Sequence, residues 1–233
     1  PTGAADGPVA SVRPESGESP ASRDAIEIGR SVEGRPVELL LRGDPDGDGV
    51  LLLATIHGDE AAGTPLLRRL ADELRAAPEK ARGRRVALVP VANPDGLAAG
   101  RRTNARGIDL NRNFPAGNFD PSLRHGAAPL SEPESRALLE LLRRERPVRV
   151  VSLHQPLAQI DWDGPGEALA RRVAARCDLP ARRIGSRPGS LGSFVGLDLG
   201  VPILTFELRR ADDRLDPDAL WERYGEALLA TLD

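Results

Sequence analysis

The stretch Gly49-Val-Leu-Leu-Leu-Ala-Thr-Ile56 is an almost continuous apolar run, and His57-Gly-Asp-Glu60 follows it without a break. An apolar run of this length predicts a buried strand of a parallel sheet. His57 and Glu60 are three residues apart, so a turn after the strand would bring both side chains to one face. An imidazole nitrogen and a carboxylate oxygen both suit Zn²⁺. The H-x-x-E spacing alone is weak, because it also arises by chance and Glu60 could be an acid near a helix start.

Two other apolar runs end at a polar residue in the same way. Val148–Leu153 precedes His154, and Pro202–Phe206 precedes Glu207. Sites in open α/β sheets lie outside the carboxyl ends of the strands, so we expect these side chains to meet the H-x-x-E pair there. Two imidazoles and one carboxylate form a three-ligand zinc shell with one open position. Glu207 is then available as a general base, and the set of groups indicates metal-assisted hydrolysis.

The rest of the chain alternates between strand-like and helix-like patterns. A hairpin is expected from Ala25–Gly29 and Pro36–Leu41, with a further strand at Arg84–Val91. Helical spacing of apolar residues predicts helices at Thr64–Ala77, Ser131–Arg146, Glu167–Cys177 and Pro217–Leu232. The alternation predicts one compact domain over residues 25–233, with a doubly wound, three-layer α/β fold on a mixed sheet.

Turn and cap signals lie between these elements. Asn93-Pro-Asp-Gly96 predicts a turn. Ser131 and Glu134 predict a capping box at the start of one helix. Residues 97–130 show little periodicity and many Gly, Pro and Asn. A long irregular stretch in a compact domain is usually functional, so we expect this one to contribute to a site.

The composition limits the partners and the compartment. Of the 233 residues 40% are hydrophobic, and the net charge is -3, so we expect no nucleic-acid partner. No apolar run is long enough to span a membrane, and the single Cys177 excludes an intrachain disulfide.

Residues 1–24, rich in Pro, Gly, Ser and charge, are expected to form a disordered arm or linker. Such a spacer often follows a cleaved leader, which favours a periplasmic or secreted location over a cytoplasmic one. The oligomeric state does not follow from the sequence.

The chain most closely resembles a known family in the stretch Arg102-Thr-Asn-Ala-Arg-Gly-Ile-Asp-Leu-Asn-Arg-Asn-Phe-Pro115. H-x-x-E after a strand, R-x-N, D-L-N-R-N-F, a later strand-end His and a final strand Glu occur in the same order in the zinc carboxypeptidase family. The resemblance covers about residues 25–230. Separated motifs in one order are far more specific than any one of them. The resemblance implies that family's fold, a single catalytic domain and one zinc ion per chain.

The resemblance also implies a role for each matched residue around the metal. Zinc would be bound by His57, Glu60 and His154. Glu207 would take a proton from the attacking water and pass it to the leaving amine. The alternative for Glu207 is a surface acid on an edge strand, but the apolar residues before it favour a buried position in a cleft.

The irregular stretch would supply the groups that bind substrate. By resemblance, Arg102 would stabilise the oxyanion that forms at the scissile carbonyl. Asn111 and Arg112 would bind the free carboxylate of a small peptide, since a guanidinium matches a carboxylate bidentately. Each has an alternative: Arg102 lies among other arginines and could be a surface charge, Asn111 could be a turn residue, and Arg112 could pair with Asp109. We expect Asp109 to be structural, supporting the Arg loop or orienting a ligand His.

Within the family, the likeness is greatest to murein peptide amidases, compact members that cleave the bond between γ-D-glutamate and diaminopimelate. Ile28–Pro36, His154–Ala158 and Gly189–Phe194 resemble segments of those enzymes. Digestive carboxypeptidases close a mobile Tyr over the substrate, from a position between the third ligand and the final Glu. Here the only Tyr is Tyr224, after Glu207, where we expect a packing role. A short, specialised amide substrate is therefore favoured over C-terminal trimming of long proteins.

Three further polar residues have open interpretations. Asp161 and Asp163 follow the apolar run that ends at the third ligand. A carboxylate there could meet the free amine of a diaminopimelate side chain, and the alternative is a solvated loop. His125 lies in a loop that contains Gly and Pro, and we expect it to be exposed.

Two other functions are compatible with the motifs. A deacylase of small N-acyl amino acids, similar to aspartoacylase or succinylglutamate desuccinylase, shares the H-x-x-E start and an Arg-rich middle. A catalytically silent binding module would keep the fold and a structural metal, but it has no use for Glu207 as a base. The D-L-N-R-N-F-P run and His154-Gln-Pro-Leu-Ala158 favour a peptide amidase. The sequence thus predicts a zinc-dependent hydrolase of a C-terminal amide bond in short peptides.

Overall fold

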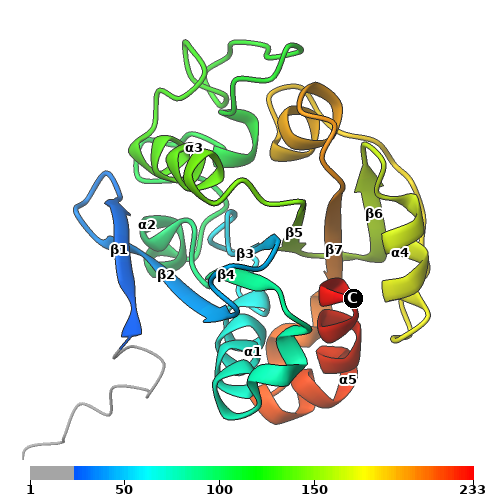
Figure 1. Cartoon of the computed structure of the whole chain (residues 1–233). Helices are drawn as coiled ribbons and strands as arrows, with labels where there is room; N and C mark the ends of the chain where they lie inside the picture. The colour runs from blue at the N-terminus through cyan, green and yellow to red at the C-terminus, as the bar shows by residue number, and fades with distance from the viewer. Residues whose placement is uncertain (1–23) are drawn as a thin grey trace, which may run out of the picture.

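The computed structural model describes residues 24–233, so the arm predicted for residues 1–24 lies outside the described part except for Asp24. Residues 24–233 contain a seven-stranded sheet in the order β1-β2-β4-β3-β5-β7-β6 (Figure 1). Its strands are β1 (Ile26–Arg30), β2 (Pro36–Gly43), β3 (Gly49–Ala54), β4 (Arg85–Val89), β5 (Arg149–His154), β6 (Leu157–Asp163) and β7 (Ile203–Arg209). The α-helices are α1 (Gly63–Ala76), α2 (Pro94–Ala99), α3 (Pro133–Glu145), α4 (Glu167–Ala174) and α5 (Pro217–Leu229).

The sheet is mixed, as the alternation of elements predicts. β4, β3, β5 and β7 are parallel neighbours in its centre. β2 and β6 add antiparallel strands on the two sides, and β1 forms the expected hairpin with β2. All of β3 is buried, and so is β5 after its first residue. This burial is typical of parallel strands covered on both faces, and it explains their continuous apolar sequences.

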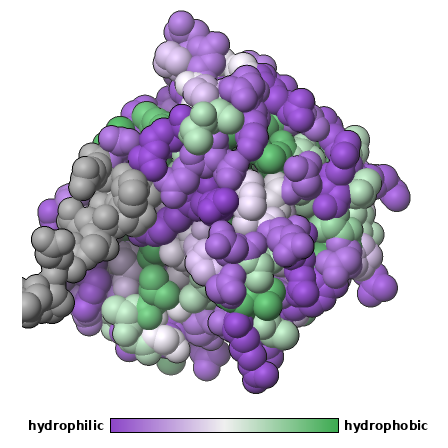
Figure 2. Space-filling view, turned by 90° about the horizontal axis from the view of Figure 1, so that it is seen from below, coloured by the Kyte–Doolittle hydropathy of each residue, from purple (hydrophilic) through white to green (hydrophobic). Residues whose placement is uncertain are grey.

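Helices cover both faces of the sheet, which gives the three layers. On one face, α1, α4 and α5 pack against the strands through residues such as Leu66, Leu169 and Leu220. On the other face, α3 and a π-helical segment contribute Leu138 and Val195 to a second core cluster. From the side of α1 and α5, Figure 2 shows polar residues over most of the surface, with apolar residues in small separate patches. Within residues 24–233, no helix combines the length and the apolar character needed to cross a bilayer.

The start of α3 differs from the predicted capping box. The helix begins at Pro133 with Glu132 as the N-cap residue, and no side chain caps it. Ser131 Oγ instead donates to Glu132 Oε1 at 2.9 Å. Glu134 Oε1 accepts a hydrogen bond from the backbone N–H of Val32 at 3.2 Å. The capping-box prediction is therefore wrong, because Ser131 donates to its neighbour Glu132 while a distant backbone group holds Glu134.

Two other segments also differ from expectation. Asn93 Oδ1 accepts a hydrogen bond from the Gly96 N–H at 2.9 Å, so the predicted turn is the capped start of α2. After His154 the chain forms the edge strand β6, which pairs antiparallel with β7, instead of a solvated loop. Strand prediction misses β6 because a glutamine and two acids interrupt its apolar residues.

The stretch after α2 is irregular, as predicted, and it is held in place by Asn113. Beyond the end of α2 and before α3, its regular structure is the 3-10 turn Leu110–Arg112. Asn113 Nδ2 donates to the carbonyl of His125 at 2.7 Å and to that of Ala128 at 3.2 Å. One buried amide thus ties the far part of the loop to the segment that carries the D-L-N-R-N-F motif.

Tyr224 has the predicted packing role and also makes a buried polar contact. Its side chain is fully buried, and its ring stands edge-on to that of Phe206 with centroids 5.8 Å apart. Its hydroxyl donates to Asp212 Oδ2 at 2.7 Å. Asp212 is itself fully buried, so this hydrogen bond helps to compensate its lost hydration.

We expect Tyr224→Phe to lower the free energy of unfolding by about 1–3 kcal/mol, because a buried carboxylate loses one donor while the ring volume is kept. Chemical denaturation followed by circular dichroism measures the change. The zinc content should match that of the wild type, since Tyr224 lies outside the site. Unchanged stability would mean that Asp212 needs no hydroxyl partner.

Candidate metal centre and catalytic cavity

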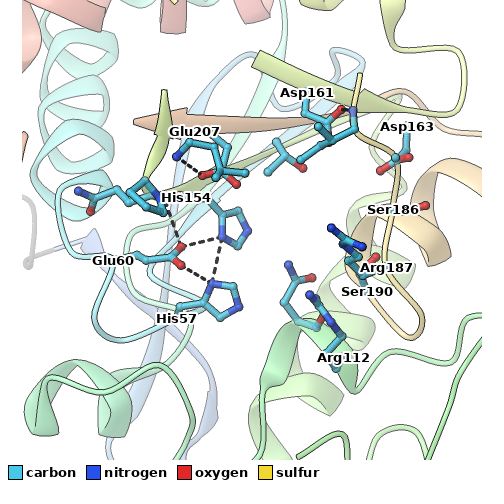
Figure 3. Close-up of a pocket in the computed structure, with 18 of the residues that line it drawn as sticks. His57, Glu60, Arg112, His154, Asp161, Asp163, Ser186, Arg187, Ser190 and Glu207 are labelled. Atoms are coloured by element: carbon cyan, nitrogen blue, oxygen red, sulfur yellow. Dashed lines mark hydrogen bonds and ion pairs between the residues drawn. The ribbon is translucent and has the colours of Figure 1, made fainter. Parts of the chain in front are cut away.

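His57, Glu60 and His154 come together at the carboxyl end of the central strands. Each offers a ligand atom, and these atoms all lie within 4.8 Å of one another. Glu60 Oε1 lies 2.9 Å from His57 Nδ1, and Glu60 Oε2 lies 2.8 Å from His154 Nδ1. The two Nδ1 atoms are 3.2 Å apart. Both imidazoles thus direct the same ring nitrogen toward one carboxylate, as Figure 3 shows.

The loop after β3 fixes the H-x-x-E pair through its backbone. Thr55 has a left-handed conformation with φ of 54°, which is unusual for a β-branched residue and turns the chain away from the strand. Its hydroxyl lies 2.7 Å from that of Thr64 at the start of α1. A Cβ atom on Gly58 would lie 1.9 Å from the carbonyl carbon of Gly96, so this position requires glycine. Close packing therefore holds the loop in one shape.

Burial and neighbouring charges shift the pKa values of His57 and Glu60 within the cluster. His57, Glu60 and His154 are 2%, 8% and 4% exposed. Burial disfavours the ionised form of Glu60, but hydrogen bonds to the two histidines outweigh it and hold the pKa of this carboxyl well below its usual range. Burial also opposes protonation of His57, yet its contacts with Asp109 and Glu60 raise the pKa of the imidazole.

Asp109 orients His57 from the side opposite Glu60. Its Oδ1 lies 3.1 Å from His57 Nε2, and its Oδ2 accepts a hydrogen bond from Arg102 Nε at 3.0 Å. Asp109 thus does both things expected of it: it supports the arginine loop and it orients a ligand histidine. The Asp109 carboxylate contacts His57 and Arg102, so the alternative, an ion pair with Arg112, is not formed.

The cluster forms one side of a cavity of about 250 Å³. Arg102 lies on its wall and donates from Nη1 to Glu60 Oε1 at 3.1 Å. Its side chain keeps 41% exposure, whereas Arg101 and Arg106 are exposed residues that do not line this cavity. Of the three arginines, Arg102 is therefore the one that faces the cavity.

Asn111 and Arg112 also line the cavity, and Figure 3 shows Arg112 across it from the two histidines. Asn111 Oδ1 accepts a hydrogen bond from the Leu191 N–H at 2.9 Å, which leaves the amide N–H groups for a ligand. Burial lowers the pKa of Arg112, and the nearby positive charges of Arg102 and Arg187 act in the same direction. This concentration of positive charge suits a carboxylate, although the position alone does not assign one.

Glu207 lies within β7 and not after it, because the strand extends to Arg209. It is paired directly opposite His154 on β5, and it lines the cavity. The carboxyl is 7% exposed, and its Oε2 accepts a hydrogen bond from the Leu157 N–H at 3.2 Å. Burial raises the pKa of Glu207, while the neighbouring His154 opposes the rise. A buried acid of this kind beside the cluster can serve as a general base.

The remaining predicted polar residues fall into two groups. Asp161 and Asp163 lie on β6, are each 3% exposed and line the cavity, so the solvated-loop alternative is wrong for both. His125 is half-buried, and its Nδ1 lies 2.7 Å from the carbonyl oxygen of Asp120. It does not line this cavity.

A family comparison agrees with this geometry. The zinc carboxypeptidase family (Peptidase_M14) matches residues 16–159. The chain belongs to the zinc carboxypeptidase family. It is accordingly a zinc metallocarboxypeptidase enzyme, and the alternative of a catalytically silent binding module is set aside.

Several relatives match this zinc carboxypeptidase over most of its length. Murein peptide amidase A of Escherichia coli K12 is 36% identical over 201 residues, which cover 77% of this chain and 78% of that protein. Murein peptide amidase A of Vibrio campbellii is 31% identical over 222 residues, covering 88% and 85%. The crystal structure of murein-tripeptide amidase from Escherichia coli O157 matches with a TM-score of 0.76 and 33% identity, over 94% of this chain and 96% of that one. Carboxypeptidase A from Helicoverpa armigera shares the fold, with a TM-score of 0.74 at 20% identity over 88% and 66%.

The donor set of this zinc carboxypeptidase fits the metal that the family name implies. Two imidazole nitrogens and one carboxylate converge in a buried position, and three protein ligands of these types are characteristic of catalytic zinc. His57 Nδ1, Glu60 and His154 Nδ1 would hold the ion. Zinc bound there would supply a water molecule activated for attack on a carbonyl.

Gln155 is a site residue that sequence reasoning missed. Its backbone N–H donates to Glu60 Oε2 at 3.1 Å, and its side-chain Oε1 accepts from the Ala62 N–H at 3.1 Å. Its Nε2 donates to the carbonyl of Arg209 and to Asp213, each at 3.0 Å. Gln155 therefore fixes Glu60 from behind. Its position directly after His154 was the one signal available, and a glutamine by itself indicates no such role.

We expect Asp109→Asn to weaken zinc binding by about 10- to 100-fold, because the second partner of a ligand histidine fixes its ring orientation and raises its basicity. Titration of metal-free protein with zinc against a chromogenic chelator measures the dissociation constant.

Asp59→Asn is the matched control for this substitution. Asp59 is exposed and close in sequence to both ligands of the loop, but it makes no contact with His57. Its removal should change zinc affinity by less than about threefold, as is usual for exposed charges. Equal weakening by both substitutions would show a general charge effect and no orienting role for Asp109.

Proposed function

We propose that this zinc carboxypeptidase hydrolyses the amide bond between γ-D-glutamate and diaminopimelate in short murein peptides. The observation that carries the proposal is the cavity beside the metal cluster, which holds a general base at one end and charged groups of both signs on its walls. Murein peptide amidases are relatives at 31–36% identity over most of both chains.

Each of the residues around the cavity would have a separate role in hydrolysis. Asn111 and Arg112 would bind the free carboxylate of the leaving amino acid, on the wall opposite the cluster. The scissile carbonyl would then lie beside Arg102, whose guanidinium would stabilise the negative charge that develops on oxygen. Glu207 would accept a proton from the attacking water and deliver it to the leaving nitrogen. Its buried position keeps bulk water from competing for that proton.

The deacylase of small N-acyl amino acids is the remaining alternative. It requires the same metal cluster and base, so the cluster does not separate the two activities. The length of the match to murein peptide amidases favours the peptide substrate. We find no contact in the cavity that favours an acyl group over a peptide.

Incubation with L-alanyl-γ-D-glutamyl-meso-diaminopimelate should release free diaminopimelate, detectable by mass spectrometry, and a chelator should stop the release. N-acetylated amino acids, tested in parallel, should be poor substrates. The reverse preference would support the deacylase and overturn the proposal.

Replacing the base gives a separate test of the chemistry. We expect Glu207→Gln to lower kcat by roughly 10²- to 10⁴-fold, the usual contribution of a general base, while zinc content stays at one ion per chain. Glu222→Gln, on the exposed side of α5, is the control and should retain full activity. Full activity of the Glu207 variant would refute its assigned role.

A further inference from the structure

The wall of the cavity away from the metal cluster carries two carboxylates from one strand. Asp161 and Asp163 are alternate residues of β6, so their side chains lie on the same face of the strand. Both are 3% exposed, and both line the cavity (Figure 3). In the figure they lie across the cavity from the two histidines. The mechanism proposed above uses neither of them.

Asp161 has a structural explanation. Its Oδ1 accepts a hydrogen bond from the Ile184 N–H at 2.8 Å. The nearby backbone groups of Trp162 and Gly185 also oppose the rise in pKa that burial imposes on this carboxyl. Asp161 thus holds the segment that leads to Ser186, and its lone pairs are engaged by the chain itself.

Asp163 is different, because its carboxylate is only partly satisfied. Ser186 lies close enough to oppose the rise in its pKa, but its Oδ1 is buried and has no hydrogen-bond partner within the described part of the chain. Burial and the neighbouring charge of Asp161 both raise the pKa of Asp163, and the exposed Arg183 compensates only in part. A buried carboxylate with an open acceptor is costly, and a cation or hydrogen-bond donor would relieve that cost.

Two glycines leave room for this carboxylate at the cavity. A Cβ atom on Gly192 would lie 2.4 Å from Asp163 Oδ2, and one on Gly196 would lie 2.5 Å from the Cβ of Asp163. Gly192 also lines the cavity. Any larger residue at position 192 would therefore collide with the carboxylate or cover it.

Charges of both signs line the part of the cavity away from the metal cluster. Arg112 and Arg187 lie on one side, and Arg187 has no hydrogen bond or ion pair from its guanidinium within residues 24–233. Asp163 lies farther along the cavity, near Ser186, as Figure 3 shows. A molecule that fills the cavity would therefore need a negative group toward the arginines and a positive group toward Asp163.

We propose that Asp163 binds an ammonium group on the side chain of the leaving amino acid, and so selects substrates whose last residue carries a side-chain amine. This inference rests on the proposed function for the reaction itself. It differs from that proposal in assigning the selection of the amine to one residue. Asp161, two positions earlier on the same strand, is assigned the structural role.

The test compares two peptides that differ in one group. L-Alanyl-γ-D-glutamyl-meso-diaminopimelate carries the amine, and the same peptide ending in 2-aminopimelate lacks it. We expect the wild type to prefer the diamino peptide by about 30- to 100-fold in kcat/KM, the range expected for one charged hydrogen-bonding contact. In Asp163→Asn this preference should fall to within about threefold, whereas Asp161→Asn, the matched control, should keep the wild-type preference.

The unfolding temperatures of the two variants distinguish a residue that binds substrate from one that stabilises the fold. Asp163→Asn removes a buried charge without changing shape, so its unfolding temperature should equal or exceed that of the wild type. Asp161→Asn should unfold at a lower temperature, since the hydrogen bond from the Ile184 N–H loses a charged acceptor. Retention of the amine preference in Asp163→Asn, or an equal loss on both peptides, would overturn the inference. If Asp163→Asn does not fold, Gly192→Ala provides the second variant, with the same expected loss of preference.

Binding of the free amino acids separates this inference from the proposed function. Calorimetric titration of zinc-loaded protein with meso-diaminopimelate and with 2-aminopimelate reports selection of the amine without turnover. If the wild type cleaves neither peptide but binds the diamino acid more tightly, and Asp163→Asn abolishes the difference, the proposed function fails and the inference stands. If the peptide is cleaved but the wild type shows no preference for the amine in either assay, the inference fails and the proposed function stands.

Discussion

The register of the parallel strands β3, β5 and β7 is the constraint on which the site depends. Ala54 at the end of β3 pairs with Leu153, and the next residue on β5, His154, pairs with Glu207 on β7. These pairings bring the ring nitrogens of His57 and His154, which are 97 positions apart in the sequence, to within 3.2 Å of each other. Because side chains alternate between the faces of a strand, a slip of one residue would move His154 or Glu207 to the other side of the sheet. The apolar runs that drive burial of these strands therefore also determine where His57, His154 and Glu207 lie.

Contacts behind the ligands then limit how far each can move. Asp109 reaches His57 from the irregular stretch and Gln155 reaches Glu60 from the end of β5. The irregular stretch in turn depends on buried amides such as that of Asn113. The site is thus assembled from a rigid sheet and a long loop that has few regular hydrogen bonds of its own. Loops of this kind carry function in many folds, because the scaffold beneath them fixes their ends.

The metal cluster and the layered fold could be predicted from the sequence, while several details could not. The sequence has continuous apolar runs followed by His57, His154 and Glu207. Such runs are required by buried parallel strands, and the carboxyl ends of these strands meet at one edge of the sheet. β6 escaped prediction because two acids interrupt its apolar residues, and the contact that holds one of them, from the Ile184 N–H to Asp161, joins residues that are distant in the sequence. The cap expected at Ser131 failed for a related reason, since Glu134 is held by a backbone group about a hundred residues away. A sequence pattern reflects the contacts that a side chain can make with its neighbours along the chain. The conformations of these side chains depend instead on tertiary contacts.

Diffraction data collected from zinc-loaded crystals on both sides of the zinc absorption edge would test the central claim most directly. The account predicts one anomalous peak per chain, about 2.0–2.2 Å from His57 Nδ1, His154 Nδ1 and the Glu60 carboxylate, with Glu207 beside it but not bound to it. A peak at another place, or ligation by Glu207 in place of Glu60, would contradict the arrangement on which the proposed chemistry rests.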